Sequence, residues 1–371
     1  MLQFVEGTSG SGKTDTIRHM LMEKAKTGEE KLLLLVPEQN SFENERAMLR
    51  LMGPKKAGRI TVTSFTRMVD LVMRQTGGLA GRRLNDSGRS ILMSLALSQV
   101  KEELVLYQKQ SGSRELVELM LSALKEFKMC GIRPEDLKAA ADRLEEGNLR
   151  KKIRETGLVM AAYEALVSQS YIDPLDDLTR LKNVLEATPF FKGYTVMVDA
   201  FAGFTAQELE VLSLVLRQAK ETVISVCVDQ DPAKDNGMGL FSPVKKTVRQ
   251  LRRIAKDYHI PLAPPIRLPH GKRFQNEELK LLEQVIYRQE RLESGEVPGH
   301  IVLYNASDIY EEADFVARRI QKLVQEEGYR YREITVIARE TESYRAFWMP
   351  LWKAMGFPIL WISRSLWRKN P

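Results

Sequence analysis

The feature that most constrains this chain is its first fourteen residues, where a short apolar segment runs directly into closely spaced glycines. Leu2, Phe4 and Val5 predict a short strand. The next residues have the spacing Gly-x4-Gly-Lys-Thr and read Gly7-Thr8-Ser9-Gly10-Ser11-Gly12-Lys13-Thr14. Glycines permit positive φ and let successive backbone amides approach an anion closely. The spacing predicts a phosphate-binding loop, in which Lys13 contacts the β- and γ-phosphates and the Thr14 hydroxyl binds Mg²⁺.

The neighbouring segments favour this interpretation over a chance match in a turn rich in glycine and serine. A helix is predicted at about residues 14–25 and a buried strand at residues 31–36. A further helix at residues 41–52 and a strand at residues 60–63 follow. Strands that alternate with helices form a parallel sheet with right-handed crossovers, and ligands collect at the carboxyl ends of its strands.

Polar and aromatic side chains follow the second and third predicted strands, as Pro37-Glu38-Gln39 and Ser64-Phe65-Thr66-Arg67. An exposed Phe65 beside hydroxyl groups and an arginine would stack on a base, while its neighbours contact phosphates. In the alternative interpretation, Phe65 fills the core between helix and sheet, and Ser64 caps a helix. We predict nucleic-acid contacts at Pro37, Gln39, Ser64, Phe65 and Arg67, and leave the alternative open.

The sheet is predicted to resume after a long helical region. Residues 86–188 have helical periodicity throughout, which predicts a helical subdomain that interrupts the sheet. The next predicted strand ends in Asp199, the position from which a phosphate-loop NTPase holds Mg²⁺. A hydrolysing helicase has a glutamate base at the following position, but this chain has Ala200, which cannot accept a proton. Glu208 is a candidate substitute, although its spacing from Thr205 predicts a helix capping box.

Composition limits the class of protein. Lys and Arg number 56 and Asp and Glu 49, so the net charge of +7 permits a polyanionic partner without requiring one. Cys130 and Cys227 are far apart in the sequence, which argues against a disulfide framework or a thiolate metal cluster. No apolar run has the length of a membrane span, and the first residues lack the basic start of a secretory signal. We therefore expect a cytoplasmic protein that does not bind a membrane.

A basic cluster lies between residues 245 and 273, where only Asp257 opposes nine basic side chains. These are Lys245, Lys246, Arg249, Arg252, Arg253, Lys256, Arg267, Lys272 and Arg273. Such a face is often merely solvated, and contact with phosphates is the alternative. Prolines at residues 261–269 predict a connector. A second α/β unit is predicted beyond it, with strands at residues 301–304 and 334–338 and helices at residues 310–325 and 344–355.

In this order, the motifs resemble those of superfamily 1 helicases of the UvrD type. The phosphate loop is followed by Leu35-Val36-Pro37-Glu38-Gln39, by Thr63-Ser64-Phe65-Thr66-Arg67 at a DNA-contact motif, by Val198-Asp199, and by Val336-Ile337-Ala338-Arg339 at the fourth helicase motif. The resemblance implies an α/β fold, with a RecA-like P-loop NTPase sheet, a helical insertion and the start of a second α/β motor-like domain. We assign the first RecA-like domain to residues 1–85 and 191–270, the insertion to residues 86–190, and the incomplete second domain to residues 271–371.

Other phrases are closer still to the AddB family, the B subunit of the bacterial AddAB helicase–nuclease. They are residues 8–14, Val36-Pro37-Glu38-Gln39, Gln75-Thr76-Gly77-Gly78, Val198-Asp199-Ala200-Phe201, Phe204-Thr205-Ala206-Gln207-Glu208 and Glu327-Gly328-Tyr329-Arg330-Tyr331. The resemblance spans nearly the whole chain. It implies processing of double-strand DNA ends for recombinational repair, as a heterodimer with the AddA motor protein.

The implied ligands are ATP with Mg²⁺ and single-stranded DNA. The nucleotide would contact Gly7, Thr8, Ser9, Gly10, Ser11, Gly12, Lys13, Thr14 and Arg339, with Thr14 and Asp199 holding the metal. Family members carry their nuclease centre and a four-cysteine iron–sulfur site in a carboxyl-terminal region that is absent here, so we expect neither DNA cleavage nor an iron–sulfur cluster. We also expect the chain to stop within its second motor-like domain. No glutamine precedes the first strand to read adenine, and the coupling motif expected after Val228 is unrecognisable, whereas Ala200 fits the family.

These observations predict a degenerate helicase core that binds ATP·Mg²⁺ and single-stranded DNA. Two alternatives stay open. One is an active ATP-driven translocase that uses Glu208 as its base, and the other is a scaffold that binds AddA or DNA without using nucleotide. A small-molecule kinase is disfavoured by the long helical insert and the second α/β unit.

Overall fold

The computed structural model describes residues 1–78, 81–229, 239–269, 272–285, 299–339 and 341–358. The chain divides into two compact units, Met1–Arg291 and Leu292–Pro371. The finer division into domains made from the sequence stays a prediction.

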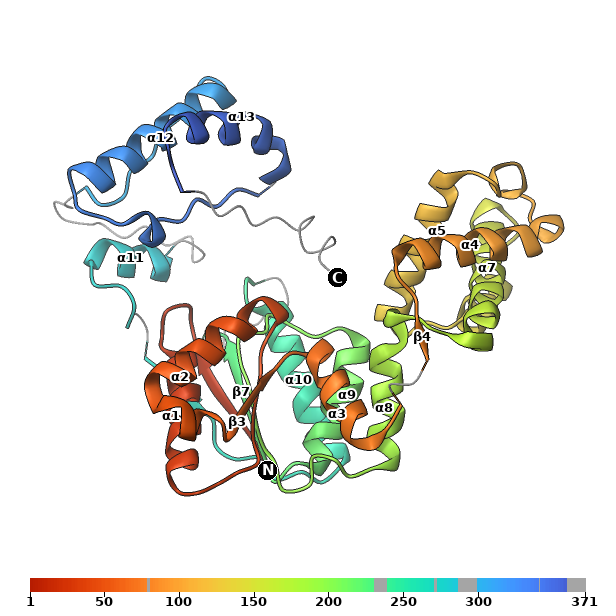
Figure 1. Cartoon of the computed structure of the whole chain (residues 1–371), viewed down its shortest axis with the longest axis horizontal. Helices are drawn as coiled ribbons and strands as arrows, with labels where there is room; N and C mark the ends of the chain where they lie inside the picture. The colour runs from red at the N-terminus through yellow and green to blue at the C-terminus, as the bar shows by residue number, and fades with distance from the viewer. Residues whose placement is uncertain (79–80, 230–238, 270–271, 286–298, 340, 359–371) are drawn as a thin grey trace. The chain divides into compact units, whose positions relative to one another are not determined.

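A six-stranded parallel sheet forms the centre of the first unit (Figure 1). Its strands are β1 (Leu2–Gly7), β2 (Leu32–Leu35), β3 (Ile60–Thr63), β6 (Thr195–Val198), β7 (Glu221–Cys227) and β8 (Ile266–Arg267). They lie in the order β3-β2-β6-β7-β1-β8, and every pairing is parallel. All four leucines of β2 are buried, as expected for a strand covered on both faces. The predicted α/β fold with a parallel sheet is confirmed.

Helices cover both faces of this sheet (Figure 1). One layer contains α1 (Lys13–Lys26) and α2 (Ser41–Ala57), and the other contains α3 (Phe65–Thr76), α8 (Asp177–Ala187), α9 (Ala206–Gln218) and α10 (Ser242–Asp257). Successive strand residues point to opposite faces, so Leu34 packs in the first core and Leu33 in the second. This arrangement places the loops that follow the strands at one open edge of the sheet. A short helix, α11 (Glu277–Val285), follows β8.

The helical subdomain has a core of its own. It contains α4 (Asp86–Gln99), α5 (Arg114–Met129), α6 (Pro134–Asp142) and α7 (Asn148–Ser170). The chain enters and leaves it through a parallel ribbon of two short strands, β4 (Arg82–Arg83) and β5 (Tyr171–Ile172). The helix α8 lies outside that core and packs on the sheet domain, because Leu181 and Leu185 belong to the core beside α3 and α9.

A buried carboxylate fixes the loop between α4 and α5. Glu155, which is 3% exposed on α7, accepts backbone hydrogen bonds from Val105, Leu106 and Tyr107 at 2.9–3.1 Å. A buried charge is tolerated when several donors surround it. The loop therefore has a defined backbone although it lacks long regular elements.

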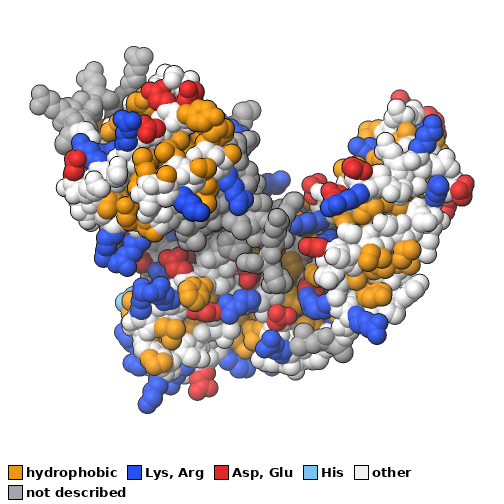
Figure 2. Space-filling view, turned by 45° about the horizontal axis from the view of Figure 1, so that its top comes forward, with side chains coloured by type: hydrophobic (Ala, Val, Ile, Leu, Met, Phe, Trp, Pro, Cys, Tyr) orange, Lys and Arg blue, Asp and Glu red, His pale blue; other side chains and the backbone are white. Residues whose placement is uncertain are grey.

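The second unit confirms the predicted helices but not the predicted strands. The helices α12 (Ile309–Gln325) and α13 (Thr341–Ala354) pack through Ala317, Trp348 and Trp352. Residues 301–304 and 334–338 form no strand. Leu303 is 98% exposed and Ile337 is 89% exposed, and Figure 2 shows hydrophobic side chains at the surface of this unit. The strand prediction is wrong because among the described residues no neighbouring strand pairs with these apolar segments.

Candidate nucleotide-binding site

The loop between β1 and α1 has the backbone of a phosphate cradle. Gly10 and Gly12 have φ of +76° and +93°, and Gly12 occupies the position before α1 in the left-handed conformation. A side chain would strain the backbone at either position. At Gly7 the reason for glycine is close packing, since a Cβ there would lie 2.4 Å from the Ser11 Oγ. The loop delivers the chain into the amino terminus of α1, where backbone N–H groups and the helix dipole favour an anion.

The Lys13 side chain folds back over this loop. Its Nζ donates hydrogen bonds to the carbonyl oxygens of Gly7 at 3.0 Å and Thr8 at 2.6 Å. The ammonium group is thereby held at the mouth of the cradle, where it can exchange these carbonyls for phosphate oxygens. Within the loop, Thr8 and Ser11 are buried, whereas Thr14, in the first turn of α1, lines the cavity described next.

A polar cavity of about 550 Å³ opens over the cradle. Its charged lining comprises Lys13, Asp15, Arg18, Glu43, Asp199, Lys272 and Arg273, and Thr14 also faces it. Cations and carboxylates are thus both present, as a metal-bound polyphosphate requires. The cavity brings together Thr14 and Asp199, the two residues predicted to hold Mg²⁺.

Asp199 is held firmly at the end of β6. It is 2% exposed, its backbone amide donates to the Leu35 carbonyl oxygen at 3.0 Å, and its Oδ1 accepts a hydrogen bond from the Ser225 hydroxyl. These bonds orient the carboxylate, and neither of them involves its Oδ2. An oriented carboxylate and a threonine that line the same cavity are a donor set that suits Mg²⁺.

Ala200 and Glu208 differ from what a hydrolytic site needs. Ala200 also lines the cavity but has φ of +64°, so the residue after Asp199 adopts the left-handed conformation and presents only a methyl group. The Glu208 carboxylate accepts a hydrogen bond from the Thr205 backbone amide at 2.8 Å. In return, the Thr205 hydroxyl accepts a hydrogen bond from the Glu208 backbone amide at 3.2 Å. Glu208 thus completes the capping box of α9 that its spacing predicted.

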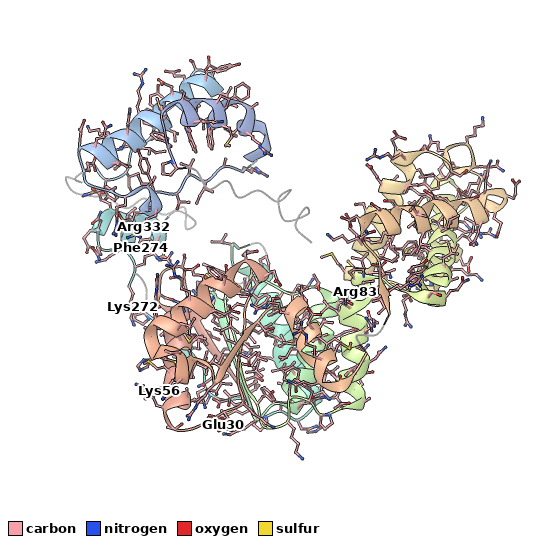
Figure 3. All side chains as sticks on the ribbon, viewed as in Figure 1. Glu30, Lys56, Arg83, Lys272, Phe274 and Arg332 are labelled. Carbon is pink, nitrogen blue, oxygen red and sulfur yellow. The ribbon has the colours of Figure 1, made fainter. Side chains whose placement is uncertain are left out.

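Two residues of this cavity were not assigned to the nucleotide site from the sequence. Lys272 and Arg273 belong to the basic cluster considered for contact with phosphates in general, and Figure 3 marks Lys272 on the segment that leaves β8. The Arg273 amide donates to the Gly10 carbonyl oxygen at 3.0 Å. A Cβ on Gly10 would come within 2.9 Å of the Arg273 Cβ. The segment therefore lies directly against the loop, because β8 pairs with β1.

Arg18 is a third cationic residue that sequence reasoning missed. It lies on α1, one turn after Thr14, and its Nε and Nη2 donate to the Asn44 Oδ1 at 3.1 and 2.9 Å. Asn44 is 4% exposed and donates in turn to the Asn40 carbonyl oxygen at 2.9 Å. The helix spacing is the only signal that could have placed Arg18 beside the loop.

The polar edge predicted to contact nucleic acid is present, but Phe65 is not exposed on it. On this edge Pro37 is half-buried and Gln39 is exposed. The Ser64 hydroxyl accepts a hydrogen bond from the Arg67 backbone amide at 3.2 Å and donates one to the Glu38 carboxylate. The Arg67 side chain forms an ion pair with Glu45 at 2.7 Å.

Phe65 is 5% exposed and its ring meets those of Phe201 and Phe204 edge-on, with centroids 5.7 and 6.2 Å away. The expectation of an exposed ring is wrong, because α3 turns Phe65 into the core between helix and sheet. The alternative interpretation, a core Phe65 and a capping Ser64, matches these contacts.

Arg339 lies in the second unit and is exposed. It lines a cavity with Glu312, Tyr344 and Trp348. Its predicted contact with nucleotide would join the two units and stays a prediction.

The chain is similar to the proteins of one known family. The model of a protein family described as "ADDB, N-terminal" matches residues 4–283, which include the loop, Asp199 and Arg273. The chain belongs to the AddB family. Three relatives are each named as the B subunit of an ATP-dependent helicase/deoxyribonuclease. Those from Thermoanaerobacter sp. strain X514 and Symbiobacterium thermophilum are each 32% identical, and that from Acetivibrio thermocellus is 30% identical.

The matches cover 96% of the AddB-family chain but only 31% or 32% of each relative. The chain thus spans about a third of the length of these proteins. Within the residues that the structure describes, no helix of this AddB-family chain is long and apolar enough to cross a membrane.

Proposed function

We propose that this AddB-family chain binds ATP with Mg²⁺ at residues 7–14 and hydrolyses the bound nucleotide only slowly. The single observation that carries the proposal is the shared cavity, which is lined by Thr14 and Asp199 and in which Lys13 lies over a loop with two left-handed glycines. Lys13, Lys272 and Arg273 would neutralise phosphate charge, and the amides of the loop would bind the phosphate oxygens.

The residues at the metal position fit Mg²⁺. Thr14 and Asp199 would hold it, since one offers a hydroxyl and the other a buried carboxylate oriented by Ser225. The bound ion would screen the charge on the β- and γ-phosphates. Arg18, held by Asn44, adds a positive charge to the lining of the cavity.

The residue after Asp199 supports slow hydrolysis. An enzyme that hydrolyses ATP rapidly positions a base to orient water, and such proton transfer contributes about 10²–10⁴ in rate. Ala200 offers no acceptor, and the Glu208 carboxylate is occupied by the Thr205 amide. We therefore expect hydrolysis slower than that of an active helicase by a factor of this order.

The family supplies the setting of the proposal. Its curated relatives are named as the B subunit of an ATP-dependent helicase/deoxyribonuclease, which implies a partner protein in a complex. We propose an AddA-like helicase–nuclease as that partner, and a cytoplasmic role in repairing double-strand breaks by homologous recombination. Single-stranded DNA would run along the carboxyl edge of the sheet beside Gln39, Ser64 and Arg67, with Pro37 shaping the first turn.

The decisive experiment measures the thermal stability of the full chain with and without ATP·Mg²⁺. Ligand at 100 times its Kd adds about 2.7 kcal/mol to the free energy of unfolding, which is a readily measured shift. Lys13→Ala should abolish the shift, while Lys26→Ala, which removes an exposed lysine from the same helix, should preserve it. An undiminished shift in the Lys13→Ala variant would overturn the assignment of the loop.

An active translocase is the competing function. It would release phosphate rapidly when DNA is added and would lose this activity in the Glu208→Gln variant. Measuring phosphate release from the parent chain with and without DNA therefore distinguishes the two functions.

A further inference from the structure

Arg18 lines the nucleotide cavity with its side chain already bound to a buried amide. Its Nε and Nη2 both donate to the Asn44 Oδ1, at 3.1 and 2.9 Å, so this one oxygen receives two hydrogen bonds. The Arg18 Nη1 also lies 3.9 Å from the Oδ1 of Asp15, a largely exposed side chain. Such an exposed ion pair contributes little. Asn44 is therefore the partner that holds the guanidinium.

Asn44 also holds the turn that follows β2. It is 4% exposed, and its Nδ2 donates to the Asn40 carbonyl oxygen at 2.9 Å. The Asn40 backbone amide donates to the Pro37 carbonyl oxygen at 2.9 Å, which closes the turn of residues 37–40. Arg18, Asn40 and Asn44 all line the cavity. One buried amide group thus joins a cation of the cavity to a backbone turn.

The γ-phosphate of a bound ATP would compete with Asn44 for Arg18. The amides of a phosphate-binding loop enclose the α- and β-phosphates, which leaves the terminal phosphate for cations of the cavity lining. A guanidinium binds a phosphate through charge-assisted hydrogen bonds that are roughly twice as strong as neutral ones. The phosphate would therefore draw Arg18 away from the neutral Asn44 oxygen. ADP, which lacks the γ-phosphate, would leave both bonds intact.

Departure of Arg18 would disturb the turn. The Asn44 oxygen would be left buried without these two donors, and an unsatisfied buried acceptor is costly. The amide group would then rotate or shift toward a new donor and lose its bond to the Asn40 carbonyl. We propose that Arg18 senses the γ-phosphate of ATP and that Asn44 relays its release to the turn of residues 37–40. This inference rests on the proposed nucleotide site.

The turn is connected to a second helix. Gln39 is exposed on it, and the Glu38 carboxylate accepts a hydrogen bond from the Ser64 hydroxyl, which also caps α3. A change in the turn therefore reaches the beginning of α3. The relay lets the chain respond to ATP and not to ADP, and it requires no hydrolysis.

The first test measures how strongly the full chain prefers the β,γ-imido analogue of ATP over ADP, by isothermal titration calorimetry with Mg²⁺. Arg18→Gln should lower this preference about tenfold, because it removes hydrogen bonds to a charged group. Asn44→Ala should raise it about threefold to tenfold, because the analogue no longer displaces an acceptor from Arg18. An arginine that only clamps the two helices together would not produce these opposite changes.

Arg59→Gln is the matched control. The Arg59 Nη1 donates to the Ala25 carbonyl oxygen at 3.0 Å, near the carboxyl end of α1. This variant also removes an arginine that is bonded to another element, so it should keep the parent's preference. Asn44→Ser is the second variant at position 44 if Asn44→Ala weakens folding.

Hydrogen exchange measured by mass spectrometry follows the turn itself. The analogue should raise the exchange rate of the amides in residues 37–41 about threefold or more in the parent, because the opened turn exposes them to solvent. ADP should leave their rate unchanged. Asn44→Ala should abolish the difference between the two nucleotides.

The outcomes separate this inference from the nucleotide site on which it rests. An unchanged preference in Arg18→Gln, or one that is unchanged or lower in the position 44 variants, would overturn the sensing role while nucleotide binding stands. Equal exchange of residues 37–41 with both nucleotides in the parent would overturn the relay. If the parent binds neither nucleotide, the site and the inference both fail.

Discussion

The backbone amide of Arg273 hydrogen-bonds the carbonyl oxygen of Gly10 across a distance of 3.0 Å. The contact joins the segment after β8 to the glycine-rich loop between β1 and α1, and it is possible only because β8 pairs with β1 in parallel. Since it uses the backbone, it survives a change of the Arg273 side chain. The contribution of the guanidinium can therefore be measured without moving the loop.

We expect Arg273→Ala to weaken ATP binding by about tenfold to a hundredfold, because a hydrogen bond to a charged group contributes roughly 1.5–3 kcal/mol. Isothermal titration calorimetry provides the measurement. Arg267→Ala is the matched control, as this exposed side chain on the same segment pairs with Glu6 outside the cavity. Unchanged ATP affinity in Arg273→Ala would show that the guanidinium does not contact phosphate.

Replacing Ala200 by glycine should stabilise the protein. Ala200 has φ of +64°, which is unfavourable for a residue with a Cβ, so Gly should raise the free energy of unfolding by about 0.5–1 kcal/mol. Urea unfolding would measure this change. Ala139→Gly, in the exposed interior of α6, should lower the free energy of unfolding by a similar amount. A loss of stability in both variants would contradict the strained backbone at Ala200.

Phe65→Ala should act chiefly on stability. The ring is 5% exposed and packs on Phe201 and Phe204, so its removal should cost about 3–5 kcal/mol. Phe42, which is 74% exposed on α2, provides the control, and Phe42→Ala should change stability by less than about 0.5 kcal/mol. If Phe65→Ala unfolds at the same urea concentration as the parent but no longer binds DNA, the ring acts as a base-stacking platform.

The pH dependence of stability should reveal Glu164. Burial raises the pKa of its carboxyl, although Lys128 opposes this effect. The folded state therefore holds the proton to a higher pH than the unfolded state, and the free energy of unfolding falls as pH rises through both pKa values. Glu164→Gln removes this loss, so its melting temperature relative to the parent should increase from about pH 4 to about pH 7. Glu118→Gln, at an exposed site on α5, should show no such trend.

Local patterns were sufficient to predict the sheet apart from β8, and the glycine-rich loop between β1 and α1. The glycine spacing of residues 7–14, the buried leucines of β2 and the Thr205–Glu208 cap are each written in a few adjacent residues. Such signals predict structure because they depend on backbone geometry and burial within one element.

The contacts that were missed depend on residues far apart in the sequence. A strand of two residues among prolines gives no periodic signal, so neither β8 nor the placement of Arg273 beside Gly10 could be predicted. Phe65 was ambiguous because its partners, Phe201 and Phe204, lie beyond the helical subdomain. Residues 301–304 have strand propensity, but a strand also needs a neighbour to receive its hydrogen bonds.

The ribbon of β4 and β5 has a consequence for how this architecture could arise. Arg82 pairs with Tyr171, so the chain leaves and rejoins the sheet domain at adjacent points, roughly 5 Å apart across the paired strands. The four helices between them have their own core. A short loop could therefore replace these helices. Evolution could exchange or enlarge them without changing the shape of the loop between β1 and α1.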